Sequence, residues 1–131
     1  NVRFIARIYD RPIAETLAFV DDFAELGSYM AMPIRTYSAG MLARLAFATS
    51  LAVDFDCYLV DEITAAGDER FRARCHDALT ARRESGTLVM VSHDPHTLKL
   101  YCDSGAVIRE GRLDLCDTLD QAISEHFGVS V

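Results

Sequence analysis

The hydrophobic pattern of this 131-residue chain changes character near residue 54. Residues 14–27 place apolar side chains at helical spacing with acidic residues opposite, which predicts an amphipathic surface helix that stops near Gly27. After a loop, residues 41–53 are apolar almost all round, which predicts a central, buried helix. We therefore expect the chain to be all helical up to about residue 54.

Strand-like segments follow this helical part. Two short apolar runs, 57–61 and 87–92, have the length of strands, and the second is rich in β-branched residues. Runs that are apolar on both faces are typical of interior parallel strands. Residues 68–85 between them carry an apolar stripe at helical spacing, with arginines on the other face. This order predicts a βαβ crossover.

Three shorter elements are expected towards the end of the chain. Residues 95–102 predict a short helix with Pro95 near its start, and residues 106–115 predict a hairpin that turns at Glu110–Gly111. Residues 117–127 predict a capped terminal helix. The sequence contains no internal repeat and no low-complexity segment.

Composition and charge narrow the class of protein. Half of the residues are hydrophobic, enough for one domain with a sizeable core. The net charge is −7 and there is no basic run, so nucleic acid is not an expected partner. The longest apolar stretch, 41–53, contains Arg44 and is shorter than the roughly 20 residues that a bilayer requires, so we expect no membrane insertion.

The cysteines and the first residue bear on the redox state of the thiols and on whether the chain is part of a longer protein. Four cysteines without any C-x-x-C pair predict reduced thiols in a cytosolic protein, and Cys57 lies inside an apolar run. The chain opens without a methionine or a signal peptide, which leads us to expect a fragment of a longer protein.

The first candidate site residues are Asp61 and Glu62, adjacent carboxylates at the end of the first predicted strand. Open parallel sheets bind ligands just beyond the carboxyl ends of their strands. There, one carboxylate can hold Mg²⁺ through water and the other can orient or deprotonate an attacking water. The alternative is an acidic pair that merely opens a loop.

His93 follows the second predicted strand, and it is expected at the same sheet edge as Glu62 if the two strands are neighbours. A histidine there can donate to a phosphate oxygen or position a water; the alternative is an ordinary loop histidine. His93 and His96 are three residues apart, but no cluster of further ligands completes a metal site.

Ser38 and Gly40 lie where the apolar helix begins. Helix N-termini present unpaired N–H groups and a partial positive charge, so they bind anions, and a glycine lets a phosphate approach the backbone. Ordinary capping by Ser38 is the alternative.

Taken in order, these segments resemble the ATP-binding subunit of an ABC transporter from its signature motif to its C-terminus. YSAGM (37–41) resembles the signature motif, and CYLVDE (57–62) the Walker B strand. AAGD (65–68) resembles the D-loop, and SHD (92–94) the switch-histidine loop. Further details are similar to the capsular-polysaccharide export ATPases, whose relatives export O-antigen and teichoic acid.

The resemblance implies an α/β fold, namely a P-loop NTPase (ABC ATPase) fragment with a helical subdomain and part of the parallel-sheet core. Residues 1–54 would be the helical subdomain, ending in the signature motif and its helix. Residues 55–131 would be the C-terminal part of the RecA-like core, with Walker B, D-loop and H-loop.

The resemblance also implies a role for each candidate residue. Glu62 would be the catalytic base, His93 would sense the γ-phosphate, and Asp61 would hold Mg²⁺ through water. The ATP-binding residues would be Ser38, Ala39, Gly40, Met41 and Asp68.

Two departures from the family pattern matter. No G-x-x-x-x-G-K-[ST] occurs, and Lys99, the single lysine, is not preceded by these glycines, so the N-terminal P-loop portion is absent. We expect this chain alone to be inactive. In the signature, Tyr37, Ala39 and Met41 replace the commonest residues, whereas Ser38 and Gly40 are kept.

By the same resemblance, two such subunits would clamp ATP between them as a homodimer and would drive an integral-membrane permease from the cytoplasmic face of the inner membrane. Two alternatives stay open: a non-transport ABC-type ATPase of translation or DNA repair, and a non-catalytic regulatory module. Neither the exported glycan nor the permease follows from the sequence.

Overall fold

The computed structural model describes residues 1–62 and 68–128, which divide into two compact units. Residues 1–55 and 68–79 form the first unit, and residues 56–62 and 80–128 form the second. The boundary expected between residues 54 and 55 stays a prediction. Among the described residues, no helix is both long enough and apolar enough to cross a bilayer.

The first unit is built from helices, as the sequence predicts. Its elements are α1 (Val2–Ile8), α2 (Ile13–Ala24), the 3₁₀ helices η1 (Gly27–Ala31) and η2 (Ile34–Thr36), α3 (Ala39–Leu51) and the first part of α4 (Glu69–Ser85). Phe23, Phe47 and Phe71 form an aromatic cluster in its core, with ring centroids 5.9–6.5 Å apart. Three segments distant in sequence are thereby joined by packing.

Helix α3 is buried on one face only. Leu45, Ala48 and Leu51 are buried, whereas Leu42 is 40% exposed, so the expectation of a helix buried all round is wrong among the described residues. The pattern of apolar residues along α3 shows which side chains could be buried, but not whether another element covers each of them.

Helix α2 ends at Ala24, three residues before the predicted stop at Gly27. Glu25 takes the left-handed conformation, with φ 52° and ψ 42°, although this region favours glycine. Its carboxylate contacts arginines of other helices, and these contacts hold a non-glycine residue in this position.

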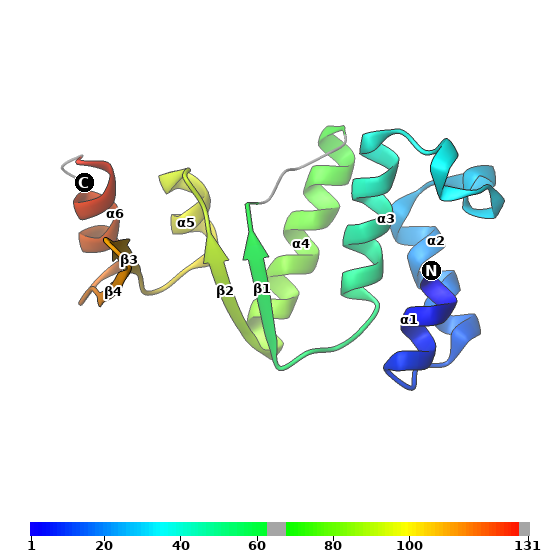
Figure 1. Ribbon diagram of the computed structural model, residues 1–131, viewed down its shortest axis with the longest axis horizontal. Coiled ribbons are helices and arrows are strands. Elements are labelled where there is room, and N and C mark those ends of the chain that lie inside the picture. The colour runs from blue at the N-terminus through cyan, green and yellow to red at the C-terminus, as the bar shows by residue number, and fades with distance from the viewer. Residues whose placement is uncertain (63–67, 129–131) are drawn as a thin grey trace. The chain divides into compact units, whose positions relative to one another are not determined.

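The second unit confirms the predicted parallel strands. Strand β1 (Cys57–Asp61) pairs in parallel with β2 (Thr87–Val91), and α4 connects them along the chain (Figure 1). Leu59 is 80% and Val91 is 59% exposed, and Cys57 is exposed as well. Burial on both faces, expected from the apolar runs, is therefore not found, because no described segment covers this face.

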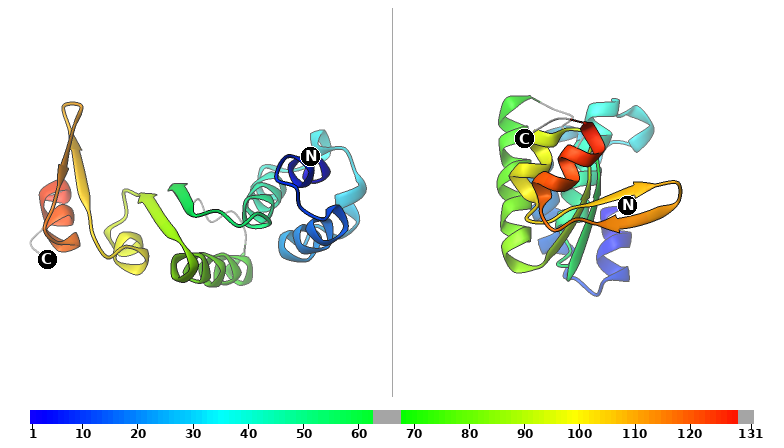
Figure 2. Two further views of the ribbon diagram at one scale, coloured as in Figure 1. Left: turned by 90° about the horizontal axis from the view of Figure 1, so that it is seen from below. Right: turned by 90° about the vertical axis from the view of Figure 1, so that its left-hand side faces the viewer.

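The end of the chain follows the prediction closely. Strands β3 (Ala106–Arg109) and β4 (Arg112–Leu115) pair antiparallel, and Glu110 and Gly111 turn with φ 48° and 78°. Helix α5 spans Pro95–Tyr101, and α6 (Leu119–Phe127) is capped by Thr118, whose hydroxyl accepts from the Gln121 N–H at 3.1 Å. Figure 2 shows the hairpin beside α6.

Cys75, rather than Cys57, is the buried thiol of the core. Burial raises its pKa from 9.0 to about 11. At pH 8 its thiolate fraction is then about a hundredfold below that of an ordinary thiol. The stability that this protonated thiol contributes is present below pH 9 and is lost as the pH rises from 9.0 to about 11.

We expect iodoacetamide at pH 8 to label Cys57 rapidly and Cys75 very slowly, because only Cys57 is exposed. Mass spectrometry of peptides over time measures both rates in one sample, with Cys57 as the internal control. Equal labelling rates for the two thiols in the folded protein would contradict the burial of Cys75.

Candidate functional site

The first group of predicted site residues meets at the carboxyl end of β1 and β2. Asp61 is paired with Val91 in the register, and the Glu62 N–H donates to the Val91 carbonyl at 3.0 Å. His93 follows two residues after Val91, and its Nδ1 donates to Glu62 Oε1. The structure thus confirms that Glu62 and His93 lie at the same edge.

Glu62 has a strained backbone, with φ 46° in the left-handed region. Such residues concentrate at functional sites, where the surrounding structure holds them in place. Here the hydrogen bond to Val91 continues the strand ladder, and the His93 contact fixes the carboxylate. Glu62 is consequently held at the strand end with its side chain 48% exposed.

Asp94 fixes the turn that carries His93. Its carboxylate accepts from the backbone N–H groups of His96 at 3.1 Å and Thr97 at 3.0 Å, which caps α5. Hydrogen bonds from Thr97, foremost that of its hydroxyl, lower the pKa of Asp94. We did not predict this cap, although Asp before Pro95 at a helix start is a recognisable signal.

Asp61 is an exposed carboxylate at the last position of β1. The described residues contain no group of three or more His, Cys, Asp or Glu side chains that could hold a metal ion. Mg²⁺ does not require such a cage, because it is usually bound by one or two carboxylates together with waters and substrate phosphates. The oxygen donors at positions 61 and 62 fit that requirement.

The second group of predicted residues lies in the first unit, at the start of α3. Ser38 is the N-cap, and its hydroxyl accepts from the Met41 N–H at 3.2 Å, so the ordinary capping role exists. Met41 packs against the hydrophobic core, whereas Ala39 is exposed. A side chain at Gly40 would meet only the Ser38 hydroxyl, at 3.9 Å, so packing within the chain does not require a glycine there.

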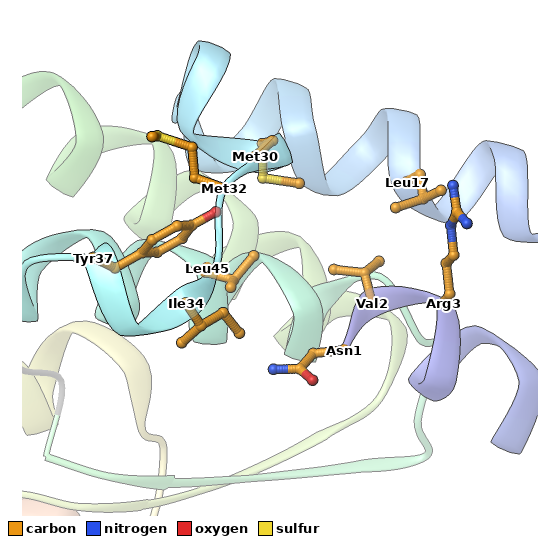
Figure 3. Close-up of a pocket in the computed structure, with 9 residues that line it drawn as sticks. All are labelled: Asn1, Val2, Arg3, Leu17, Met30, Met32, Ile34, Tyr37 and Leu45. Carbon is orange, nitrogen blue, oxygen red and sulfur yellow. The ribbon is translucent and has the colours of Figure 1, made fainter.

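Tyr37, which departs from the common signature, has a local structural role. Its hydroxyl donates to the Tyr29 carbonyl at 2.6 Å and so ties the signature segment to η1. Its ring also borders an open pocket of about 290 Å³ (Figure 3). That pocket is lined by Asn1, Val2, Arg3, Leu17, Met30, Met32, Ile34, Tyr37 and Leu45. None of the predicted site residues lines it.

Asp68 is the described residue of the predicted D-loop, since residues 65–67 lie outside the described ranges. Its Oδ1 accepts from the Phe71 N–H at 2.9 Å, and its Oδ2 accepts from Arg44 at 3.2 Å. The hydrogen bond from the Phe71 N–H lowers the pKa of Asp68, and Arg44 adds to this effect. Asp68 thus belongs to the first unit, as do residues 38–41.

The chain has the fold of part of an ABC-transporter ATP-binding subunit. A solved structure of such a subunit matches with a TM-score of 0.79 and 21% identity, covering 97% of this chain and 54% of that one. The expected fold class is confirmed. No protein-family profile matches the chain.

The sequence is similar to ATP-binding proteins of polysaccharide exporters, which confirms the finer resemblance. It is 46% identical over 122 residues to the capsule polysaccharide export ATP-binding protein CtrD of Neisseria meningitidis serogroup B, covering 93% of this chain and 56% of CtrD. It is 45% identical over 129 residues to the polysialic acid transport ATP-binding protein KpsT of Escherichia coli, covering 96% of this chain and 59% of KpsT. The chain therefore spans just over half the length of these relatives.

Proposed function

We propose that the full-length protein containing this chain is the ATP-hydrolysing subunit of an ABC exporter for capsular or another cell-surface polysaccharide. The observation that carries the proposal is the contact between Glu62 and His93 at the carboxyl edge of a parallel strand pair. The similarity to CtrD and KpsT supports the same function. It also disfavours a role in translation, DNA repair or non-catalytic regulation.

In this function Glu62 is the general base. Water attacks the γ-phosphorus, a new O–P bond forms, the bond to the ADP oxygen breaks, and the water proton passes to the Glu62 carboxylate. His93 holds that carboxylate through Nδ1, and its side chain is 80% exposed, which leaves the ring accessible to a phosphate oxygen. Mg²⁺ held by Asp61 through water would neutralise phosphate charge.

The segment 38–41 would bind the phosphates of an ATP molecule held by a second copy of the protein. Two observations support this role: α3 begins with exposed residues at Ser38 and Ala39, and no packing inside the chain demands Gly40. A helix start of this kind suits an anion. The homodimer, a permease partner and a place on the cytoplasmic face of the inner membrane belong to the same proposal.

ATP binding should distinguish the 131-residue chain from the full-length protein. Because the 131 residues contain no P-loop, we expect them to show no micromolar affinity for Mg-ATP and no turnover, whereas the full-length protein shows both. Isothermal titration and phosphate release measure the two properties. Micromolar binding by the 131-residue chain would contradict this prediction, and a full-length protein without turnover would contradict the proposed function.

A further inference from the structure

The C-terminal end of α2 is the meeting point of several arginines in the first unit. Arg74 donates to Glu25 Oε1 at 2.8 Å, and Arg70 lies 3.1 Å from the same oxygen. Arg44 of α3 lies 4.0 Å from Glu25 Oε2. Since the Glu25 side chain is only 25% exposed, its charge is balanced mainly by these guanidinium groups.

Arg44 is the least exposed of the three arginines, and it also contacts Asp68. Its side chain is only 17% exposed, and Nη2 donates to Asp68 Oδ2 at 3.2 Å. Its Cζ atom lies 4.5 Å from the centre of the Phe71 ring. The planar guanidinium therefore lies between two carboxylates and against an aromatic face, an arrangement that an ammonium group cannot reproduce.

Asp68 uses both carboxylate oxygens within the chain. Oδ1 receives the Phe71 N–H and so caps the start of α4, while Oδ2 receives Arg44. The carboxylate that follows the Asp61–Glu62 strand in the sequence is thereby joined to α3, one turn after Gly40. The contact connects the helix that begins with the proposed phosphate-binding segment 38–41 to the start of α4.

We propose that Arg44 is a positioning residue, which holds the signature helix α3 to the start of α4 through Asp68 and Glu25. Asp68 then acts through Arg44 rather than on the nucleotide. The pair keeps the segment 38–41 in a fixed orientation to the helix that follows the D-loop, so its loss slows turnover without weakening ATP binding. This inference rests on the proposed function, because it assigns the pair a role in ATP hydrolysis.

The test compares kcat and KM for Mg-ATP in the full-length protein. We expect Arg44→Gln and Asp68→Asn each to lower kcat about tenfold with KM within about twofold. The double variant should be no slower than either single variant, because both remove one interaction. Arg44→Lys keeps the charge but loses the planar fork that reaches both carboxylates, so it should restore little of the rate.

Arg70→Gln is the matched control, because Arg70 contacts the same Glu25 but its side chain is 78% exposed. It should leave kcat unchanged. Asp68→Asn keeps the test valid if Arg44→Gln fails to fold, because the Asp68 side chain is 66% exposed.

Several outcomes would overturn the inference. An unchanged kcat in Asp68→Asn and Arg44→Lys, even with a lower melting temperature, would show that the pair contributes to stability and not to turnover. Additive losses in the double variant would show that the two residues act independently. A wild-type protein without turnover would overturn the proposed function together with this inference, whereas the other outcomes overturn the inference alone.

Discussion

Glu62→Gln in the full-length protein is expected to lower ATP turnover on the order of 10²- to 10⁴-fold, because glutamine cannot accept the proton of the attacking water. ATP affinity should stay close to that of the wild type, since the amide has the size of the carboxylate. His93 can still contact the Oε1 position, so the strand edge should keep its structure. Phosphate release and equilibrium ATP binding measure the two effects, and polysaccharide export in complemented cells should fail accordingly.

Glu69→Gln is the control for this variant. It makes the same chemical change at an exposed glutamate in the first turn of α4, outside the proposed site. Its turnover should equal that of the wild type. If Glu62→Gln hydrolysed ATP at the wild-type rate, Glu62 would not be the base.

Phe71→Ala should destabilise the folded protein by about 3–5 kcal/mol, a large share of the 5–15 kcal/mol typical of a domain. Phe71 is 2% exposed and makes edge contacts with Phe23 and Phe47. The guanidinium of Arg44 also lies over the Phe71 ring. Removing it leaves a cavity in the core and an arginine without its aromatic support.

The measurement is the midpoint of urea unfolding followed by circular dichroism, with Phe4→Ala as the matched control. Phe4 is 65% exposed, so its truncation should change stability by no more than about 0.5 kcal/mol. Similar midpoints for the two variants would show that Phe71 is not a central part of the core.

Much of the secondary structure could be predicted because it depends on neighbours a few residues apart. The hairpin turn at Glu110–Gly111 and the capped terminal helix are local features: the turn is found where it was predicted, and the helix is capped, by Thr118. The end of α2 was predicted wrongly at Gly27 because the true stop, Glu25, is held by arginines about 45–50 residues further along the chain. No local pattern contains that information.

Some features of the candidate site could likewise be predicted from the sequence, and others could not. The adjacent carboxylates and the histidine were recognisable as motifs, and the parallel pairing predicted that Glu62 and His93 share an edge. The left-handed backbone of Glu62 and the Arg44 contact of Asp68 were not recognisable, because each depends on packing between separate elements. The assignment of nucleotide contacts to residues 38–41 stays a prediction.

The sequence by itself determined the class of protein, the order of its motifs and the residue types available for chemistry. It did so because periodicity, caps and turns are encoded in short segments. Only the tertiary structure decided which apolar faces are covered, which arginine holds Asp68, and that His93 contacts Glu62. The two side-chain contacts join residues 24 and 31 positions apart, and coverage of a face depends on other elements of the chain; packing sets both, and local pattern does not.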